Sequence, residues 1–182
     1  MKKYQIIYAD PPWSYNDKMK GHSFSLDHEY ETQSKDWIAG LLRGGGVLQD
    51  KDCVLFLWAT SPLLPEALDV IKEWGFKYKT VAFVWNKKTK NGKDVSNLGK
   101  WTMGNVEVCL LATKGKPQRI AKNIKQLVSA ERTIHSKKPD EVRKRIVELM
   151  GDLPRIELFA REKTEGWDVW GNEVESDIEI KV

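Results

Sequence analysis

The sequence predicts an α/β protein whose strands and helices alternate around a mostly parallel, doubly wound sheet. Apolar runs of strand length recur along the chain, and segments with apolar residues at helical spacing lie between them. No internal repeat or linker interrupts this alternation. The chain has 182 residues, which is enough for one domain with a real core, and we expect residues 1–182 to form a single domain.

The first half of the chain predicts two strands and two helices. The apolar run 6–9 is predicted to be a buried strand, and a short helix over 34–43 has Ser34 as its cap and three glycines at its end. A strand is expected over 53–58. The helix that follows ends at Gly75 and carries apolar residues at helical spacing, namely Leu64, Ala67, Leu68, Ile71 and Trp74.

The second half predicts strands over 77–85, 106–112 and 155–160. Pro139 is expected to start a helix that ends before Gly151, with a buried stripe formed by Val142, Ile146, Leu149 and Met150. The polar segment 116–135 has no pattern that predicts a helix or a strand. No Gly-x-Gly-x-x-Gly fingerprint is present, which disfavours a nicotinamide-dependent dehydrogenase.

The first strand leads into Asp10-Pro11-Pro12-Trp13. Prolines have no N–H and a fixed φ, so the strand ends in a stiff corner that holds a carboxylate, carbonyls and an aromatic plane. These groups suit an exocyclic amine such as N6 of adenine. The Asp10 carboxylate and the Pro11 carbonyl would accept its two hydrogens, and Trp13 would stack on the base. The alternative is an ordinary strand-to-loop turn with a surface tryptophan.

Asp-Pro-Pro-Trp resembles motif IV of amino-methyltransferases, above all in the MT-A seventy family. That family includes a subunit of the mRNA adenosine methyltransferase and bacterial and phage adenine methyltransferases. Segments resembling the family follow in its order at 54–60, 136–141, 156–161 and 170–173. The resemblance implies a Rossmann-like class I methyltransferase fold with the permuted, β-class motif order, because Asp10 precedes the cofactor strand 155–160.

The resemblance also implies S-adenosylmethionine as the cofactor. The catalytic residues that it implies are Asp10, Pro11, Pro12 and Trp13, and the cofactor-binding residues are Asp10, Lys138, Phe159, Arg161, Asn172 and Glu173. Lys138 precedes a helix N-terminus, which favours an anion such as the cofactor carboxylate. Asp10 and Arg161 both follow strands, where doubly wound sheets bind ligands. The alternative interpretation of Lys138 or Arg161, each taken singly, is an ordinary surface cation. The alternative for Asn172 is a turn residue after Gly171.

Positive charge is concentrated between residues 86 and 125, where ten lysines and arginines face only Asp94 and Glu107. Such a stretch is suited to bind the phosphate backbone of a nucleic acid. The alternative is a solvated loop that is rich in lysine. We expect substrate-binding loops near 14–33 and 86–104. The expected substrate-binding residues, of which Tyr30 follows from the resemblance, are Trp13, Tyr15, Tyr30, Lys87, Lys88, Lys90, Lys93 and Trp101.

The function expected is methyl transfer to N6 of adenine, and the resemblance implies DNA as the acceptor, because small stand-alone members of the family typically act on DNA. The alternatives are an RNA adenosine N6-methyltransferase, a non-catalytic nucleic-acid-binding partner subunit, and a methyltransferase of a small molecule or protein amide. A homodimer and a heterodimer both stay open. Neither the cysteines nor the histidines show metal-ligand spacing, and no apolar run is long enough for a membrane span, so we expect a cytoplasmic protein without a structural metal. The resemblance implies that the cell is a bacterium or a phage-infected host.

Overall fold

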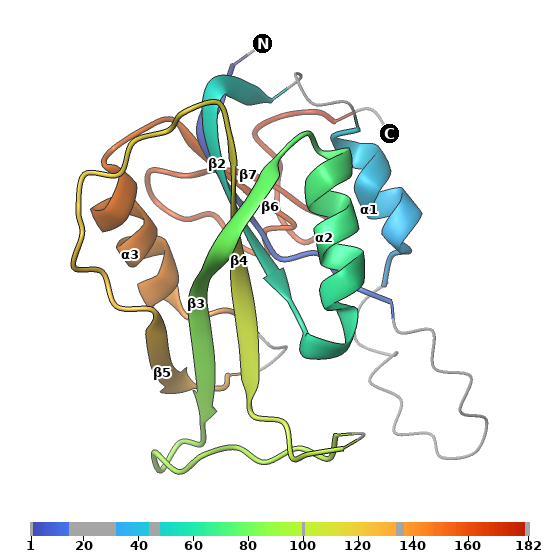
Figure 1. The fold of residues 1–182 in the computed structure, drawn as a ribbon, viewed down its shortest axis with the longest axis vertical. Helices are drawn as coiled ribbons and strands as arrows, with labels where there is room; N and C mark the ends of the chain where they lie inside the picture. The colour runs from blue at the N-terminus through green and yellow to red at the C-terminus, as the bar shows by residue number, and fades with distance from the viewer. Residues whose placement is uncertain (1, 15–31, 44–47, 100, 134–136, 181–182) are drawn as a thin grey trace.

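The computed structural model describes residues 2–14, 32–43, 48–99, 101–133 and 137–180. Within these residues, seven strands form one sheet in the order β5-β3-β4-β2-β1-β6-β7 (Figure 1). The strands are β1 (Tyr4–Ala9), β2 (Gln49–Ala59), β3 (Lys77–Lys88), β4 (Val106–Lys114), β5 (Leu127–Glu131), β6 (Arg155–Leu158) and β7 (Asp168–Trp170). The helices are α1 (Lys35–Leu41), α2 (Leu64–Glu73) and α3 (Asp140–Met150).

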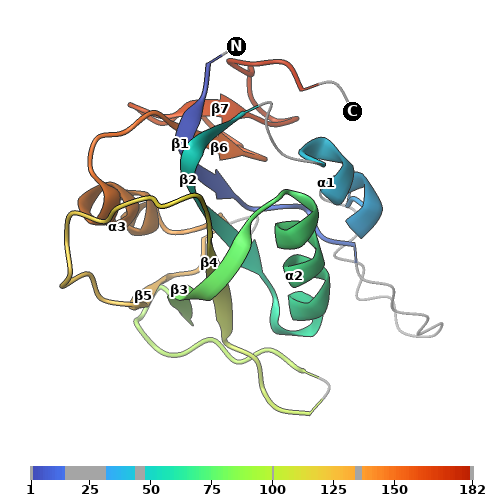
Figure 2. The same cartoon turned by 45° about the horizontal axis from the view of Figure 1, so that its top comes forward.

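The sheet is mostly parallel, as predicted. Strand β4 runs antiparallel to both β2 and β3, whereas the other neighbouring strands are parallel to each other. Helices α1 and α2 cover one face and α3 covers the other (Figures 1 and 2). Successive side chains of β1 point to opposite faces of the sheet. Ile7 packs in the hydrophobic cluster that contains residues of α1 and α2, and Ile6 packs in the cluster that contains residues of α3.

Some local signals for helix ends are confirmed, although α1 ends at Leu41 instead of residue 43 and α3 begins at Asp140, one residue after Pro139. The Ser34 hydroxyl accepts a hydrogen bond from the Trp37 N–H at 3.2 Å and caps α1. Gly75, with a φ of 77°, follows the end of α2. Among the apolar residues at helical spacing in α2, Ala67 and Ile71 are buried, whereas Leu68 is 42% exposed.

Several parts of the sheet differ from the expectation, and the strand expected over 155–160 ends at Leu158. Strand β5 lies in the polar segment 116–135, where its short apolar run is broken by polar residues and gives no strand pattern. Strand β7 has three residues and no clear sequence signal. Strand β3 continues to Lys88, so the expected loop start at residue 86 is wrong.

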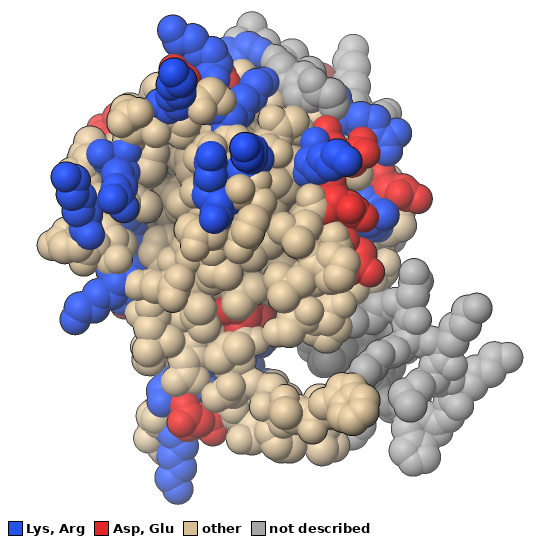
Figure 3. All heavy atoms as spheres, viewed as in Figure 1, with Lys and Arg blue, Asp and Glu red and all other residues tan. Residues whose placement is uncertain are grey.

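The basic stretch 86–125 does not form one surface. In the antiparallel pairing, Asn86 lies opposite Val106 at one end of β4, and Lys77 lies opposite Thr113 near the other end. The nine residues of β4 separate its ends by roughly 27 Å. Figure 3 shows most cations of this face over its upper half, away from the β3–β4 connection at the bottom. The single basic footprint that was expected is therefore divided between distant regions.

Candidate active site

Asp10 lies where three parallel strands end. It follows β1 directly, and β1 pairs in parallel with β2 on one side and with β6 on the other. Its backbone N–H donates to the Leu158 carbonyl at 3.4 Å, at the end of β6. This is the edge at which open α/β sheets bind ligands.

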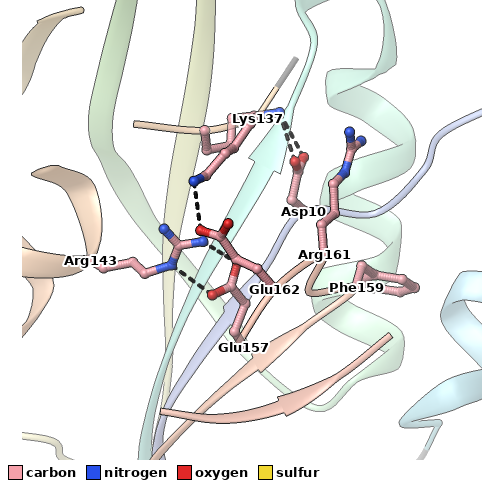
Figure 4. Close-up of a pocket in the computed structure, with 8 residues that line it drawn as sticks. Asp10, Lys137, Arg143, Glu157, Phe159, Arg161 and Glu162 are labelled. Carbon is pink, nitrogen blue, oxygen red and sulfur yellow. Dashed lines mark hydrogen bonds and ion pairs between the residues drawn. The ribbon is translucent and has the colours of Figure 1, made fainter. Parts of the chain in front are cut away.

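One pocket at this edge contains predicted site residues from distant segments. Its lining residues are Asp10, Lys137, Lys138, Arg143, Glu157, Phe159, Arg161 and Glu162. In Figure 4 the side chains of Asp10 and Arg161 point the same way from the ends of neighbouring segments. The prediction that these two residues share one crevice is confirmed.

Lys138 does not extend freely into this pocket. Its Nζ lies 2.8 Å from Oδ1 and 2.9 Å from Oδ2 of Asp10, and 3.0 Å from Oε2 of Glu107. The other oxygen of Glu107, Oε1, accepts from Nζ of Lys87. We call the four residues Lys87, Glu107, Lys138 and Asp10 the charge row. Its charges alternate in sign from β3 to the end of β1.

The first three members of the charge row are buried, with exposures of 9% for Lys87, 7% for Glu107 and 8% for Lys138. Burial raises the pKa of the Glu107 carboxyl, but the charges of Lys138 and Lys87 outweigh burial and hold that pKa below its usual range. Burial lowers the pKa of Lys138, but the carboxylates of Asp10 and Glu107 outweigh it and raise the pKa above its usual range. Both groups are therefore charged at neutral pH.

A second ion pair fixes the wall of the pocket. The Arg143 guanidinium on α3 donates to Glu157 on β6, with Nε 2.7 Å from Oε2 and Nη2 3.0 Å from Oε1. The guanidinium also lies 5.9 Å from the ring of Tyr8, whose hydroxyl accepts from Trp58 Nε1 at 2.7 Å. Burial raises the pKa of Glu157 despite the opposing charge of Arg143. These contacts link α3, β6, β1 and β2 behind the pocket.

The two C-terminal segments of the expected cofactor site lie against each other. The Ala160 N–H donates to the Trp170 carbonyl at 3.0 Å, and a Cβ on Gly171 would lie 2.2 Å from the Ala160 carbonyl oxygen. Gly171 therefore permits this close approach. Phe159 has a φ of 62°, and its ring centroid lies 5.5 Å from that of Trp170.

These contacts place Arg161, Asn172 and Glu173 in one region. Arg161 Nε lies 3.8 Å from Oε1 of Glu173. Asn172 and Glu173 are exposed and are outside the set of described residues that line the pocket. The structure therefore places Phe159 and Arg161 at the pocket, with Asn172 and Glu173 beside it.

The expectation that Trp13 offers an open stacking surface is wrong. Its side chain is 8% exposed, and its indole N–H donates to the Trp58 carbonyl at 3.0 Å. The corner is closed further by the Trp13 N–H, which donates to the Pro11 carbonyl at 2.9 Å, and by the Gln33 N–H, which donates to the Pro12 carbonyl at 2.7 Å. Trp13 thus fixes the corner against β2.

The expected substrate-binding lysines fall into different environments. Lys87 is buried in the charge row, which corrects its assignment to an exposed phosphate-binding loop. Lys88 pairs with Asp94 at 2.6 Å, and Lys90 and Lys93 are exposed. Tyr15 and Tyr30, with most of the loop near 14–33, lie outside the described residues.

The connection between β3 and β4, residues 89–105, is a segment that we call the finger. It ends in a hairpin, where Asn97 and Gly104 exchange backbone hydrogen bonds of 3.0 and 2.8 Å. The described apolar side chains of this hairpin are exposed, at 93% for Leu98, 98% for Trp101 and 55% for Met103. Trp101 therefore lies on an exposed tip, as a base-stacking residue requires.

Sequence reasoning assigned Lys87 a different role, and it missed Glu107, Arg143 and Glu157 as members of the site. Glu107 carries one available signal, since it is one of only two acids in the basic stretch. An isolated acid among many cations is expected to pair with them.

The family of the chain follows from a comparison of its sequence with known protein families. The MT-A70 family model matches residues 4–173, which is most of the chain. The chain belongs to the MT-A70 family. The resemblance to the MT-A seventy family is thereby confirmed, and with it the prediction of a methyltransferase.

Individual relatives of the family differ in how much of their length the chain covers. The type II methyltransferase M.MunI of Mycoplasma sp is 39% identical over 196 aligned positions, which cover 98% of the chain and 82% of that protein. The human N(6)-adenosine-methyltransferase catalytic subunit METTL3 is 28% identical, with 95% of the chain and 28% of that protein covered. The Drosophila melanogaster N(6)-adenosine-methyltransferase MT-A70-like protein is 29% identical, with coverage of 95% and 27%. The chain thus spans about a quarter of the two animal proteins.

The described residues include neither a cluster of metal ligands nor a membrane-spanning helix. They contain no group of three or more His, Cys, Asp or Glu side chains arranged to hold a metal ion. No helix among them has the length and apolar character needed to cross a membrane.

Proposed function

We propose that the chain is an adenine N6-methyltransferase that uses S-adenosylmethionine and acts on DNA. The observation that carries the proposal is the placement of Asp10, from the Asp-Pro-Pro-Trp corner, in one pocket with Phe159 and Arg161. DNA is favoured over RNA because the type II methyltransferase M.MunI is matched at higher identity and over far more of its length than the adenosine methyltransferases.

The donor set of the pocket suits S-adenosylmethionine, which carries a carboxylate, an ammonium, a ribose diol and an adenine. Arg161 offers a cation, and Lys138 adds a positive charge at the pocket wall while it pairs with Asp10 and Glu107. Asp10 offers a carboxylate for the ammonium, and Phe159 offers an aromatic surface. Asn172 and Glu173 offer polar groups for the ribose and adenine edges. When bound, the cofactor supplies a methyl group activated by a sulfonium.

The corner would prepare the adenine amine as nucleophile. A carboxylate has about four acceptor sites, so the contacts from Lys138 leave acceptor capacity on Asp10 for an amine hydrogen. The Pro11 carbonyl accepts from the Trp13 N–H and has a second lone pair for the other hydrogen. Acceptors fixed in this way favour the charge that develops on the amine during transfer.

Direct transfer needs no covalent enzyme intermediate, and the cysteines support this route. Cys53 and Cys109 are both fully buried. Burial raises the pKa of the Cys53 thiol to about 12, and it raises that of Cys109 well above its usual range. Neither thiol has the depressed pKa of a catalytic nucleophile.

The finger is the part that we assign to nucleic acid. Lys90 and Lys93 would contact phosphates, Lys88 lies beside them, and Trp101 would stack on a base near the flipped adenine. Tyr15 and Tyr30 remain proposed substrate contacts, as do the loops near 14–33 and 86–104. We further propose that residues 1–182 act as one methyltransferase domain in the cytoplasm of a bacterium or phage-infected cell, alone or as a homodimer or heterodimer.

The test is incubation of the purified protein with methyl-labelled S-adenosylmethionine and a DNA duplex, followed by identification of the labelled nucleoside. RNA of the same sequence is the matched substrate. We expect N6-methyldeoxyadenosine and much less label in RNA. Preferential labelling of RNA would support the adenosine methyltransferase alternative. Nucleic-acid binding without any transfer would support the non-catalytic partner subunit.

A further inference from the structure

The environment of Lys87 does not suit a lysine that binds phosphates. It lies on β3, and its backbone is fixed on both sides: its N–H donates to the Asn105 carbonyl at 3.0 Å, and its carbonyl accepts from the Val95 N–H at 2.9 Å. Its Nζ lies 5.1 Å from the centroid of the Trp85 ring and contacts Glu107 Oε1. Its charge is therefore directed into the protein.

The geometry of the charge row makes Glu107 a competitor for Lys138. Lys138 Nζ lies 3.0 Å from Glu107 and 2.8 Å from Asp10, so the two carboxylates attract it at nearly equal range. Lys87 contacts the far oxygen of Glu107 and balances its charge. Without Lys87, the excess negative charge on Glu107 would draw Lys138 away from Asp10, because Coulomb attraction is strong in a poorly solvated site.

We propose that Lys87 is a positioning residue for methyl transfer: it balances Glu107, so that Lys138 stays on Asp10 and holds its carboxylate in the reactive direction. The inference rests on the proposed function, because it assigns to Asp10 the contact with the reacting amine. It replaces the phosphate-binding role expected for Lys87, and the two roles predict different kinetics. A positioning residue changes kcat, whereas a phosphate contact changes nucleic-acid affinity and its salt dependence.

The test compares Lys87→Met with Lys79→Met, which changes an exposed lysine on the same strand. Single-turnover methylation, the KM for a DNA duplex and the salt dependence of DNA binding are measured for both variants. We expect Lys87→Met to lower the transfer rate about 10–100-fold, as loss of an outer partner of a reacting group does in metal sites. Its DNA affinity and salt slope should stay those of wild type, and Lys79→Met should change none of these quantities.

A double variant separates positioning from a general loss of structure. Lys87→Met/Glu107→Gln removes the unbalanced charge, so it is expected to transfer methyl faster than Lys87→Met. Thermal unfolding establishes that each variant is folded. An unchanged rate for Lys87→Met, with weaker DNA binding and a salt slope lower by about 0.9, would overturn the proposal in favour of a phosphate contact. A double variant no faster than the single one would also overturn it. Absence of transfer by wild type would instead overturn the proposed function.

Discussion

Strands β3 and β4 carry both the finger and two members of the charge row, Lys87 and Glu107, yet the charges of the two regions are in opposite environments. Lys87 is buried and paired with Glu107 near the base of the β3–β4 connection. Lys90 and Lys93, only a few residues further on, are exposed to solvent. Neighbouring lysines in one basic run therefore have different environments, and we propose different roles for them: Lys87 positions the Asp10 carboxylate through Glu107 and Lys138, and Lys90 and Lys93 contact a polyanion.

The difference shows that burial, more than the number of neighbouring cations, decides whether a lysine contributes to folding and catalysis or to binding affinity. Exposed ion pairs contribute about 0–1 kcal/mol, because water and salt screen them. A buried pair is costly to break, since the partner keeps an uncompensated charge away from water. Variants in the charge row should therefore affect folding and catalysis, and variants in the finger should affect affinity.

The largest effect on folding is expected for Lys138→Met. This change leaves the carboxylates of Asp10 and Glu107 close together without their shared cation. Removing one partner of a buried pair costs about 3–5 kcal/mol, and urea unfolding should show a loss of that order. Lys144→Met, an exposed position on α3, is the control. A loss no greater than that of the control would mean that the charge row does not stabilise the fold.

The finger should show an intermediate effect on binding alone. Lys90→Met/Lys93→Met is expected to weaken DNA binding and to flatten its salt dependence by about 0.9 in the log–log slope for each phosphate that is no longer neutralised. The free energy of unfolding and the cofactor affinity should stay those of wild type. A binding titration at several salt concentrations checks this. An unchanged slope would show that these lysines belong to an ordinary solvated loop.

The smallest expected effect is the contribution of Glu107 to the pH dependence of the free energy of unfolding. Because the pKa of this carboxyl is lowered in the folded state, its ionised form stabilises folding above its unfolded pKa of about 4.3. That contribution is lost as pH falls through the folded pKa. The stability difference between wild type and Glu107→Gln should therefore shrink with acidification when unfolding is measured from neutral pH down to about pH 3. A difference that is constant over this range would contradict the assigned ion pairs.

Much of the fold was predictable because its signals are local. The apolar run before Asp10, the Ser34 cap and the Gly75 helix end each depend on a few adjacent residues. Motif order placed Asp10, Phe159 and Arg161 together, since residues that follow neighbouring parallel strands meet at one edge.

The features that were missed depend on partners distant in sequence. The roles of Lys87 and Glu107 follow from a pairing between strands and from a contact with Lys138, on the segment before α3. Trp13 is buried because β2 offers it the Trp58 carbonyl, 45 residues away. The sequence of a motif does not show which residues from distant segments will pack against its side chains or pair with them.

The most direct test of the central claim is the single-turnover methylation rate of Asp10→Asn against wild type, with saturating cofactor and DNA. Asparagine keeps the size of the side chain but removes its charge and one acceptor oxygen beside Lys138. Loss of one such fixed group costs roughly 10²–10³ in rate in comparable sites, and we expect a fall of at least that order in a folded protein. A rate near that of wild type would contradict the role assigned to Asp10.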